Sequence, residues 1–405
     1  MTHILVIGAG QAGATLAITL RQGGFDGSIT LVGEEPTAPY QRPPLSKGYL
    51  LGKMPAERLL LRPPSFYEQA GIALRTNARA EAIDPIRKRV QVGGASIAYD
   101  TLVLATGSVP RCLPAAMGGA LSGVYLIRSL ADVDAMAAAF QPGARVLVVG
   151  GGYIGLEAAA VAVSRGLQVV LVEAAARILQ RVAVPQTSEY FRALHRRHGV
   201  RIIEGVGLAR IEGAHRASGA LLGDGTRLEV DFVIVGVGIE PATQLARGAG
   251  LRIENGIWTD AFGHTSDGQI WAVGDCASFP WRGGRLRLES VPHAIDHATA
   301  VAQNILGAGQ PYEAKPWFWS DQYDVKLQMA GWHAGYDRVV RRQAAHAAQG
   351  SVSFWSYRGG RFVAVEAMNA PRDYVVGRQM LARGVSPAPK AIAEGTTNLR
   401  ALLAT

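Results

Sequence analysis

The fold class follows from the stretch His3-Ile-Leu-Val-Ile-Gly8-Ala-Gly10-Gln-Ala-Gly13, which runs on to Ile29-Thr-Leu-Val-Gly-Glu34-Glu35. An apolar strand ends in Gly-x-Gly-x-x-Gly, a small-residue helix follows, and a second strand ends near two acids. The first glycine permits a tight turn, the second lets backbone approach a pyrophosphate, and the third lets helix and strand pack closely. The phosphates lie at the positive end of the helix. We therefore predict a dinucleotide site, with Glu34 at the ribose hydroxyls.

The same pattern recurs in Arg145-Val-Leu-Val-Val-Gly150-Gly-Gly152-Tyr-Ile-Gly155-Leu-Glu157, which leads through an Ala-rich helix to Gln168-Val-Val-Leu-Val-Glu173. A structural duplication with one inactive copy is the alternative, but both copies keep their glycines and a terminal acid. We therefore predict a second nucleotide site. A carboxylate at Glu173 favours free ribose hydroxyls and repels a 2′-phosphate, so NADH is expected over NADPH. Arg177 and Arg181 leave the strictness of that preference open.

Length and composition predict an α/β enzyme. A chain of 405 residues, 48% hydrophobic, has room for two or three domains. It contains no apolar run of about 18 residues, so no membrane span is predicted. Because the first strand starts at His3, we expect no signal peptide and a cytoplasmic protein.

The cysteines and charges exclude other classes of site. Two isolated cysteines, Cys112 and Cys276, form neither a redox pair nor a metal site, and we expect both to be buried small hydrophobic residues. No metal is predicted. The net charge of +9 is spread along the chain with no basic cluster or recognisable module, so no nucleic acid is expected. Two interpretations of this charge remain: a positive face that binds an acidic protein partner, or a surface that is merely well solvated.

Further segments point to the same two sites. The prolines of residues 39–47 should hold Arg42 and Lys47 rigidly over phosphates or a ring, unless the segment is an ordinary surface turn. The strand ending in Ala105-Thr106-Gly107 should let backbone lie against the first nucleotide. Asp275 should bond a polyol, with a helix cap as the alternative. Ser129 is expected to cap a helix.

The last part of the chain changes to an antiparallel pattern. Strands are expected near residues 325–330, 338–342, 351–357 and 362–366, and Arg358-Gly359-Gly360-Arg361 should form a hairpin turn. A final amphipathic helix is expected near residues 372–383. The prediction is a separate C-terminal domain.

The ordered set of motifs resembles a known family over essentially the whole chain. It comprises both glycine loops, Arg42-Pro-Pro-Leu-Ser-Lys47, Ala105-Thr-Gly107, Gly274-Asp275, Glu289-Ser-Val291 and Trp317-Phe-Trp319-Ser-Asp-Gln. This set resembles the FAD-dependent ferredoxin reductases of bacterial oxygenase systems, of the putidaredoxin reductase type. The resemblance implies two Rossmann-like, glutathione reductase-like dinucleotide-binding domains plus a C-terminal α+β domain. Residues 1–113 and 242–316 would bind FAD, residues 114–241 would bind NADH, and residues 317–405 would cover the flavin.

The resemblance also implies individual roles. FAD would be held by Gly8, Gly10, Gly13, Ala14, Glu34, Arg42, Lys47, Ala82, Thr106, Gly107, Arg128, Asp275 and Val291. NADH would be held by Gly152, Tyr153, Ile154, Gly155, Glu157, Glu173 and Gly238. Trp319 would lie near the flavin and the electron exit, and Lys47 and Glu157, paired beside the flavin, would be positioning groups with it at the catalytic centre. His293 and His297 receive no role.

The implied reaction takes a hydride from NADH and releases single electrons to a two-iron two-sulfur ferredoxin that serves a cytochrome monooxygenase or a dioxygenase. A flavin can make this two-to-one conversion. Residues 43–47 contain no cysteine, so transfer through an internal disulfide is disfavoured. The partner is expected to be acidic and transiently bound, and the reductase a monomer or weak dimer. Alternatives are a reductase of a small-molecule acceptor (quinone, monodehydroascorbate or oxygen) and a flavin redox sensor resembling apoptosis-inducing factor.

Overall fold

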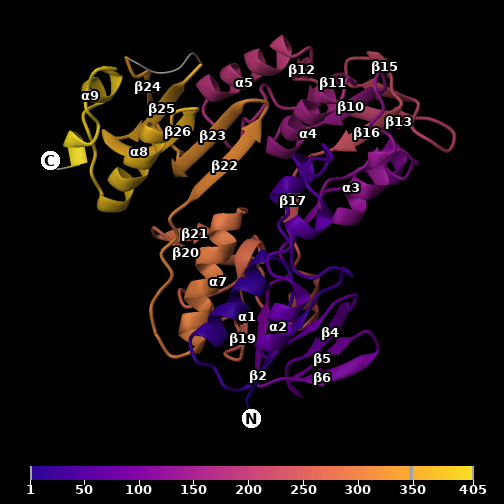
Figure 1. The fold of residues 1–405 in the computed structure, drawn as a ribbon, viewed down its shortest axis with the longest axis vertical. Coiled ribbons are helices and arrows are strands. Elements are labelled where there is room, and N and C mark those ends of the chain that lie inside the picture. Colours follow the sequence, from indigo (N-terminus) through magenta and orange to yellow (C-terminus); the bar gives the residue numbers. More distant parts are fainter. Residues whose placement is uncertain (1, 346–349, 404–405) are drawn as a thin grey trace. The chain divides into compact units, whose positions relative to one another are not determined.

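The structure is a computed structural model that describes residues 2–345 and 350–403 (Figure 1). The described residues form two compact units. Unit 1 comprises Met1–Arg42, Pro55–Val109 and Ile239–Pro316. Unit 2 comprises Pro43–Met54, Pro110–Gly238 and Trp317–Thr405. Each unit is therefore built from three stretches of chain, and each carries one of the glycine motifs.

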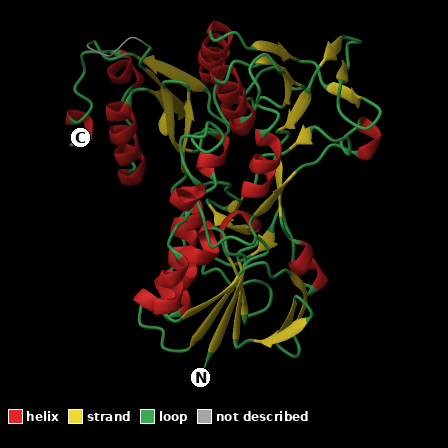
Figure 2. Cartoon of the chain, turned by 45° about the vertical axis from the view of Figure 1, so that its right-hand side comes forward, coloured by secondary structure: helices red, strands yellow, loops and turns green. Residues whose placement is uncertain are grey.

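A sheet of strands forms the centre of unit 1 (Figure 2). It is parallel, and its strands lie in the order β19-β7-β1-β2-β3. The strands are β1 (His3–Ile7), β2 (Ser28–Val32), β3 (Ile72–Arg75), β7 (Thr101–Leu104) and β19 (Ile270–Ala272). Helices α1 (Gln11–Gln22) and α7 (Val291–Ile305) pack on each other. Leu16 of α1 and Val301 of α7 lie fully buried with Val6 of β1 in one core cluster. The apolar strands are buried because helices and loops cover the sheet, as parallel sheets require.

Strand register brings the ends of this sheet together. Ile7 pairs with Val32 on one side and with Leu104 on the other. The loops that follow β1, β2 and β7 therefore leave the sheet at the same edge, which is where open α/β sheets bind ligands.

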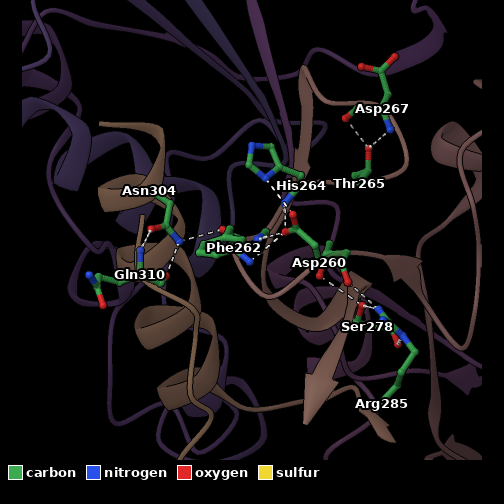
Figure 3. Close-up of polar contacts among 11 residues, drawn as sticks. Asp260, Phe262, His264, Thr265, Asp267, Ser278, Arg285, Asn304 and Gln310 are labelled. Carbon is green, nitrogen blue, oxygen red and sulfur yellow. Dashed lines mark hydrogen bonds and ion pairs between the residues drawn. The ribbon is translucent and has the colours of Figure 1, made fainter. Parts of the chain in front are cut away.

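Smaller elements complete unit 1. They are η2 (Ala56–Leu59), α2 (Pro64–Gln69), an antiparallel sheet of β4 (Ala80–Asp84), β5 (Arg89–Val92) and β6 (Ala95–Ala98), then β17 (Ile239–Pro241), α6 (Gln244–Gly248), and a sheet of β18 (Ile257–Trp258), β20 (Ala277–Trp281) and β21 (Gly284–Leu286). The loop between β18 and β19 is tightly held (Figure 3). Asp260 accepts from the backbone N–H groups of Phe262, Gly263 and His264, each at 2.9 Å. Asn304 of α7 donates to the Phe262 carbonyl at 3.0 Å, so the loop that leads into β19 is tied to the helix.

A second parallel sheet lies in unit 2, with strands in the order β12-β11-β10-β16-β9. Its elements are β9 (Val124–Tyr125), α3 (Leu130–Ala137), β10 (Arg145–Val149), α4 (Tyr153–Ser164), β11 (Gln168–Glu173), α5 (Pro185–Arg197), β12 (Arg201–Glu204) and β16 (Phe232–Val235). The expected cap of α3 is present: the Ser129 side chain accepts from the Asp132 N–H, and the Asp132 carboxylate accepts from the Ser129 N–H. Unit 2 also contains η1 (Pro43–Ser46), η3 (Ala115–Met117), β13 (Leu208–Glu212), β14 (Gly219–Leu222) and β15 (Arg227–Glu229). Strand β8 (Ser108–Pro110) begins in unit 1 and pairs with β17.

The C-terminal part of unit 2 is an antiparallel sheet in the order β22-β23-β26-β25-β24. Its elements are β22 (Trp317–Gln322), β23 (Val325–Gly331), β24 (Arg338–Arg342), β25 (Val352–Arg358), β26 (Arg361–Met368), α8 (Pro371–Arg383), α9 (Pro389–Ala393) and η5 (Ala401–Leu403). Arg358 pairs with Arg361, and Gly359 and Gly360 both have positive φ, as the predicted two-residue hairpin turn requires. The expected strands and final helix are confirmed, whereas β22 and α9 were not predicted.

The predicted fold class is confirmed, with two parallel-sheet dinucleotide folds and a C-terminal α+β region. One local prediction is wrong. Cys112 is exposed, not buried, because it lies in the irregular segment after β8, and such connecting segments run over the protein surface. Residues 43–46 form a short 3-10 helix, since the fixed φ of proline suits a first helical turn. No helix in the described part of the chain is long and apolar enough to cross a membrane.

Candidate functional site

The first glycine loop joins β1 to α1, and its glycines are required for different reasons. Gly8 has φ +113°, and a Cβ there would lie 2.1 Å from the Ala105 carbonyl oxygen. A Cβ at Gly13 would lie 1.9 Å from the Gly8 oxygen. A Cβ at Gly10 would meet no described atom within 4 Å, and Gly10 has φ −86°, which suits any residue. Protein packing thus explains Gly8 and Gly13, and leaves Gly10 to be explained by a ligand that approaches the backbone.

The second loop, between β10 and α4, repeats this arrangement. Gly150 has φ +104° and a Cβ there would lie 2.4 Å from the Gly236 oxygen, while one at Gly155 would lie 2.1 Å from the Gly150 oxygen. A Cβ at Gly152 would meet no described atom within 4 Å. Both helices begin directly after these open glycines, at residues whose N–H groups have no side-chain cap. Each loop therefore offers a concave backbone and a helix N-terminus, which fit the pyrophosphate of a dinucleotide.

The acid after the second strand differs between the loops. In unit 2, Glu173 ends β11, and its carboxylate accepts from the N–H groups of Gly151 and Ala175, each at 2.7 Å. A carboxylate has capacity for further donors, so ribose hydroxyls can still be bound. In unit 1, Glu34 is exposed and pairs with Arg79 at 3.4 Å. Its neighbour Glu35 instead turns inward on its loop.

Glu35 anchors Arg42, the first predicted cation. The Arg42 guanidinium lies 2.5 Å from the Glu35 carboxylate, and its centre lies 5.1 Å from the centroid of the Tyr40 ring. The Tyr40 hydroxyl donates to the same carboxylate at 2.5 Å. Arg42 is thereby held in a fixed direction at the end of unit 1. The sequence prediction named Arg42 but missed Glu35, because adjacent acids cannot be told apart by pattern.

The remaining predicted residues of unit 1 cluster at the ends of its strands. The Thr106 hydroxyl donates to the Ala242 carbonyl at 2.6 Å, and the Ala242 N–H donates to the Gly107 carbonyl at 3.0 Å. Asp275 lies in η4 (Gly274–Cys276) and accepts from the Ser108 hydroxyl at 2.9 Å. It is thus part of a short turn and not a cap.

The other residues predicted to hold FAD lie on separate elements of the chain. Val291 is the first residue of α7, whose N-cap is Ser290. Ala82 lies exposed in β4 beside a register irregularity. Ala14 is fully buried in α1, so it can offer a ligand backbone only. Arg128 lies in unit 2, immediately before the capped helix α3.

Lys47 and Glu157 form the expected ion pair, inside unit 2. The Lys47 ammonium lies 2.7 Å from the Glu157 carboxylate, which is buried on the first turns of α4. The hydroxyls of Ser46 and Ser320 also donate to that carboxylate, each at 2.6 Å. Neither serine was predicted, since Ser46 is 111 residues and Ser320 163 residues away in sequence.

The first turn of α4 also contacts β22 and β23. Tyr153 packs its ring on Phe318, with centroids 4.5 Å apart, and its hydroxyl lies 2.8 Å from the Met329 sulfur. Ile154 is exposed. Trp319 follows Phe318 on β22, half-buried, with its ring centroid 5.7 Å from that of Trp317. Gly238 has φ +106°, and its carbonyl accepts from the Arg111 N–H.

Histidines that received no role from the sequence are buried in unit 1. His293 and His297 lie on α7 and stack with centroids 5.1 Å apart. Burial lowers the pKa of His293 to about 4 and that of His297 well below its usual range. Both are therefore neutral core groups, as expected for histidines on such a helix. Among the described residues, no cluster of three or more His, Cys, Asp or Glu side chains could hold a metal ion.

These features define a class of protein: a chain with two dinucleotide cradles, each on its own parallel sheet, and a separate antiparallel region. The chain belongs to the pyridine nucleotide-disulphide oxidoreductase family, whose model matches residues 2–298. A reductase C-terminal model matches residues 317–403.

Known proteins agree with this membership. The chain is 42% identical to the 5,5'-dehydrodivanillate O-demethylase ferredoxin reductase subunit of Sphingobium sp., over 99% of this chain and 98% of that one. It is 40% identical to rhodocoxin reductase of Rhodococcus erythropolis, over 99% and 94% of the two chains. Among solved structures, it matches the reductase in the covalent putidaredoxin reductase-putidaredoxin complex with a TM-score of 0.95, 38% identity, and coverage of 100% and 98%. The resemblance inferred from the sequence is confirmed.

Proposed function

We propose that this chain is an NADH:ferredoxin oxidoreductase that carries FAD. It takes a hydride from NADH and passes single electrons to a two-iron two-sulfur ferredoxin that serves a cytochrome monooxygenase or a dioxygenase. The observation that carries the proposal is the pair of glycine loops, in which a Cβ at Gly10 or Gly152 would meet no described atom within 4 Å. The names of the relatives, which are ferredoxin reductases of oxygenase systems, supply the acceptor.

We propose the following division of the chain and its residues. Residues 1–113 and 242–316 bind FAD, residues 114–241 bind NADH, and residues 317–405 form the C-terminal domain. Gly10, with the first turn of α1, holds the FAD pyrophosphate, and Gly152, with the first turn of α4, holds that of NADH. Glu173 takes the NADH ribose hydroxyls. The assignments of the other predicted residues stand as given above.

Bound flavin supplies the chemistry that accepts two electrons as a hydride and releases them singly. The side chains of the protein orient the reacting groups and exclude water from them. The Lys47 ammonium is held by the buried Glu157 carboxylate, and Ser46 and Ser320 hold that carboxylate in place. Tyr153 is packed against Phe318 at the first turn of α4, where it shields the end of the nucleotide loop. Lys47, Glu157 and Trp319 are proposed to lie at the reacting centre.

The partner is proposed to be an acidic iron-sulfur ferredoxin that binds transiently, and the reductase a cytoplasmic monomer or weak dimer. The net charge of +9 supports electrostatic association with an acidic protein. Because exposed charges are screened by salt, reduction of such a partner should slow as ionic strength rises.

The test is NADH-driven reduction of cytochrome c by the purified holoenzyme, with and without an added two-iron ferredoxin, and with ferricyanide and NADPH as controls. Strong dependence on the ferredoxin, falling with salt, is expected. Ferricyanide reduction with no response to several ferredoxins would refute the proposed acceptor and point to a small molecule or a sensing role. A ferredoxin-dependent rate that is insensitive to salt would refute the electrostatic part alone.

A further inference from the structure

A continuous line of hydrogen bonds leads from the Glu157 carboxylate to the turn between β22 and β23, all within unit 2. The Ser320 hydroxyl donates to Glu157 at 2.6 Å, and the Gln322 side chain lies 3.1 Å from Ser320. The Gln322 amide oxygen lies 2.8 Å from Nε2 of His195. Nδ1 of His195 lies 3.1 Å from the hydroxyl of Tyr323. The line crosses from α4 through β22 to α5.

The direction of every bond in this line follows from its carboxylate end. An ionised carboxylate only accepts, so Ser320 must donate to Glu157, and its oxygen is left to accept from the Gln322 N–H. The Gln322 amide oxygen then faces His195, whose Nε2 must carry the proton. Nδ1 is thereby an acceptor, and the Tyr323 hydroxyl donates to it.

The inner members of the line are buried, Tyr323 is half-buried, and all four side chains are neutral. Ser320 and His195 have no exposed surface and Gln322 is 1% exposed. Burial lowers the pKa of His195 to about 4 and raises the pKa of Tyr323 well above its usual value, so neither side chain changes charge near neutral pH. The amide of Gln322 relays no proton at ordinary pH, because its N–H is too weakly acidic to be given up and its oxygen is too weakly basic to be protonated. The line is therefore suited to hold geometry and not to conduct protons.

The outer end carries an independent sign of constraint. Tyr323 is the first residue of the turn between β22 and β23, and its φ is +56°. A bulky aromatic residue rarely adopts this left-handed conformation, which Gly, Asn or Asp fill at such turns. The Tyr323 ring stacks on His198, with centroids 3.7 Å apart, and its hydroxyl meets His195. Strained backbone of this kind persists where the surroundings impose it, and it clusters at functional sites.

We propose that Tyr323, His195, Gln322 and Ser320 are positioning residues that act through Glu157 on Lys47. Their one-directional bonds fix the carboxylate against α4, and the carboxylate in turn sets where the Lys47 ammonium lies. The proposal rests on the proposed function in one respect, namely that Lys47 and Glu157 lie at the reacting centre. It adds that this centre is positioned by side chains of α5, of β22 and of the turn that follows β22.

The first experiment tests the line itself and is independent of activity. NMR of holoenzyme labelled with ¹⁵N-histidine should show His195 as the neutral tautomer with the proton on Nε2, unchanged from pH 5.5 to 9. The Gln322→Met variant keeps a similar side-chain length and removes the acceptor, so His195 should become a mixture of tautomers. A proton on Nδ1 in the native protein, or titration near pH 6.5, would overturn the proposal.

The second experiment tests the effect on the centre, with a matched control. Ser320→Ala removes one donor to Glu157. Ser353→Ala removes an equally buried serine of the same antiparallel sheet, which donates to Asp373 at 2.7 Å and has no part in the line. In stopped-flow reduction of the bound flavin by NADH, Ser320→Ala should lower the limiting rate about tenfold with little change in the apparent Kd for NADH, while Ser353→Ala should leave both unchanged.

The outcomes separate this proposal from the proposed function. Equal effects of Ser320→Ala and Ser353→Ala would overturn the positioning role. Should Ser320→Ala fail to fold, Tyr323→Phe at the outer end replaces it, and it should also shift the His195 tautomer and slow flavin reduction. A native protein whose flavin is not reduced by NADH would refute the proposed function instead, and the NMR result would still decide whether the line exists.

Discussion

Gly152→Ala should damage NADH binding without damaging the fold. At Gly152 the backbone has φ −79° and ψ −178°, which alanine adopts freely, and a Cβ meets no described atom within 4 Å. The loss of a glycine at a helix N-cap and the gain from a less flexible unfolded chain are each below about 1 kcal/mol and opposite in sign. We expect the free energy of unfolding to change by less than about 1 kcal/mol.

The added methyl instead occupies the space proposed for the NADH pyrophosphate. We expect the KM for NADH in ferricyanide reduction to rise at least about tenfold, which corresponds to about 1.4 kcal/mol. Flavin content, measured by visible absorbance, should stay normal. Gly155→Ala is the matched variant for packing, because its Cβ would lie 2.1 Å from the Gly150 oxygen. It should destabilise the protein by about 1–3 kcal/mol or more.

The corresponding change in the first loop has a different readout. Gly10→Ala should fold normally and lose flavin, because a Cβ there also meets no described atom within 4 Å. An unchanged KM for NADH in Gly152→Ala, in protein with normal flavin content, would refute the assignment of the second loop. Normal flavin content in Gly10→Ala would refute that of the first.

Further predictions concern acids and a helix cap. Burial raises the pKa of Glu366 to about 7 from 4.5, so the folded state holds its proton more tightly, and stability should fall as pH rises from about 4.5 to 7 by up to about 3 kcal/mol. Glu366→Gln should remove this fall in urea unfolding series; parallel pH profiles would contradict it. Glu173→Ala should narrow the preference for NADH over NADPH in kcat/KM by about tenfold, and an unchanged ratio would assign the preference elsewhere. Ser129→Ala should cost about 1 kcal/mol in urea unfolding, whereas no loss would mean that the capping box contributes nothing.

What could be predicted from the sequence is what depends on neighbours in sequence. The glycine loops, the Ser129 cap and the Gly359-Gly360 turn each follow from a few adjacent residues, and the structure has them where expected. The pairing of Lys47 with Glu157 was available only through the family resemblance. No spacing rule links Lys47, which follows η1, with Glu157 on α4.

What could not be predicted depends on distant residues meeting. Ser46 and Ser320 reach Glu157 from different parts of the chain, and Gln322 and His195 are 127 residues apart. The exposure of Cys112 could not be predicted for the same reason, because burial of a loop residue depends on which distant segments pack against it. A single serine or glutamine belongs to no recognisable sequence pattern. The hydrogen bonds around Glu157 therefore could not be predicted before the positions of the strands were known.

The two glycine loops are not copies, and one contact explains the difference between their acids. Register makes Gly33 of unit 1 equivalent to Glu173 of unit 2, since each follows the residue paired with the end of the first strand. A Cβ at Gly33 would lie 2.6 Å from the Ala9 Cβ, so the side chain inside the glycine motif forbids one after the second strand. In unit 2 the motif carries Gly151 at the position of Ala9, and Glu173 fills the space and accepts its N–H.

Unit 1 therefore has a side chain at Ala9 and none at Gly33, whereas unit 2 has no side chain at Gly151 and has one at Glu173. In unit 1 the first acid after the second strand is Glu34, one residue further along the chain. Its side chain is exposed, whereas the Glu173 carboxylate is bound by N–H groups of its own loop. Gly151→Ala would place a Cβ 2.6 Å from the Ile178 side chain and 3.2 Å from the Glu173 carboxylate. The two units therefore present the acids that we propose to bind ribose from different backbone positions, although their glycine spacing is identical.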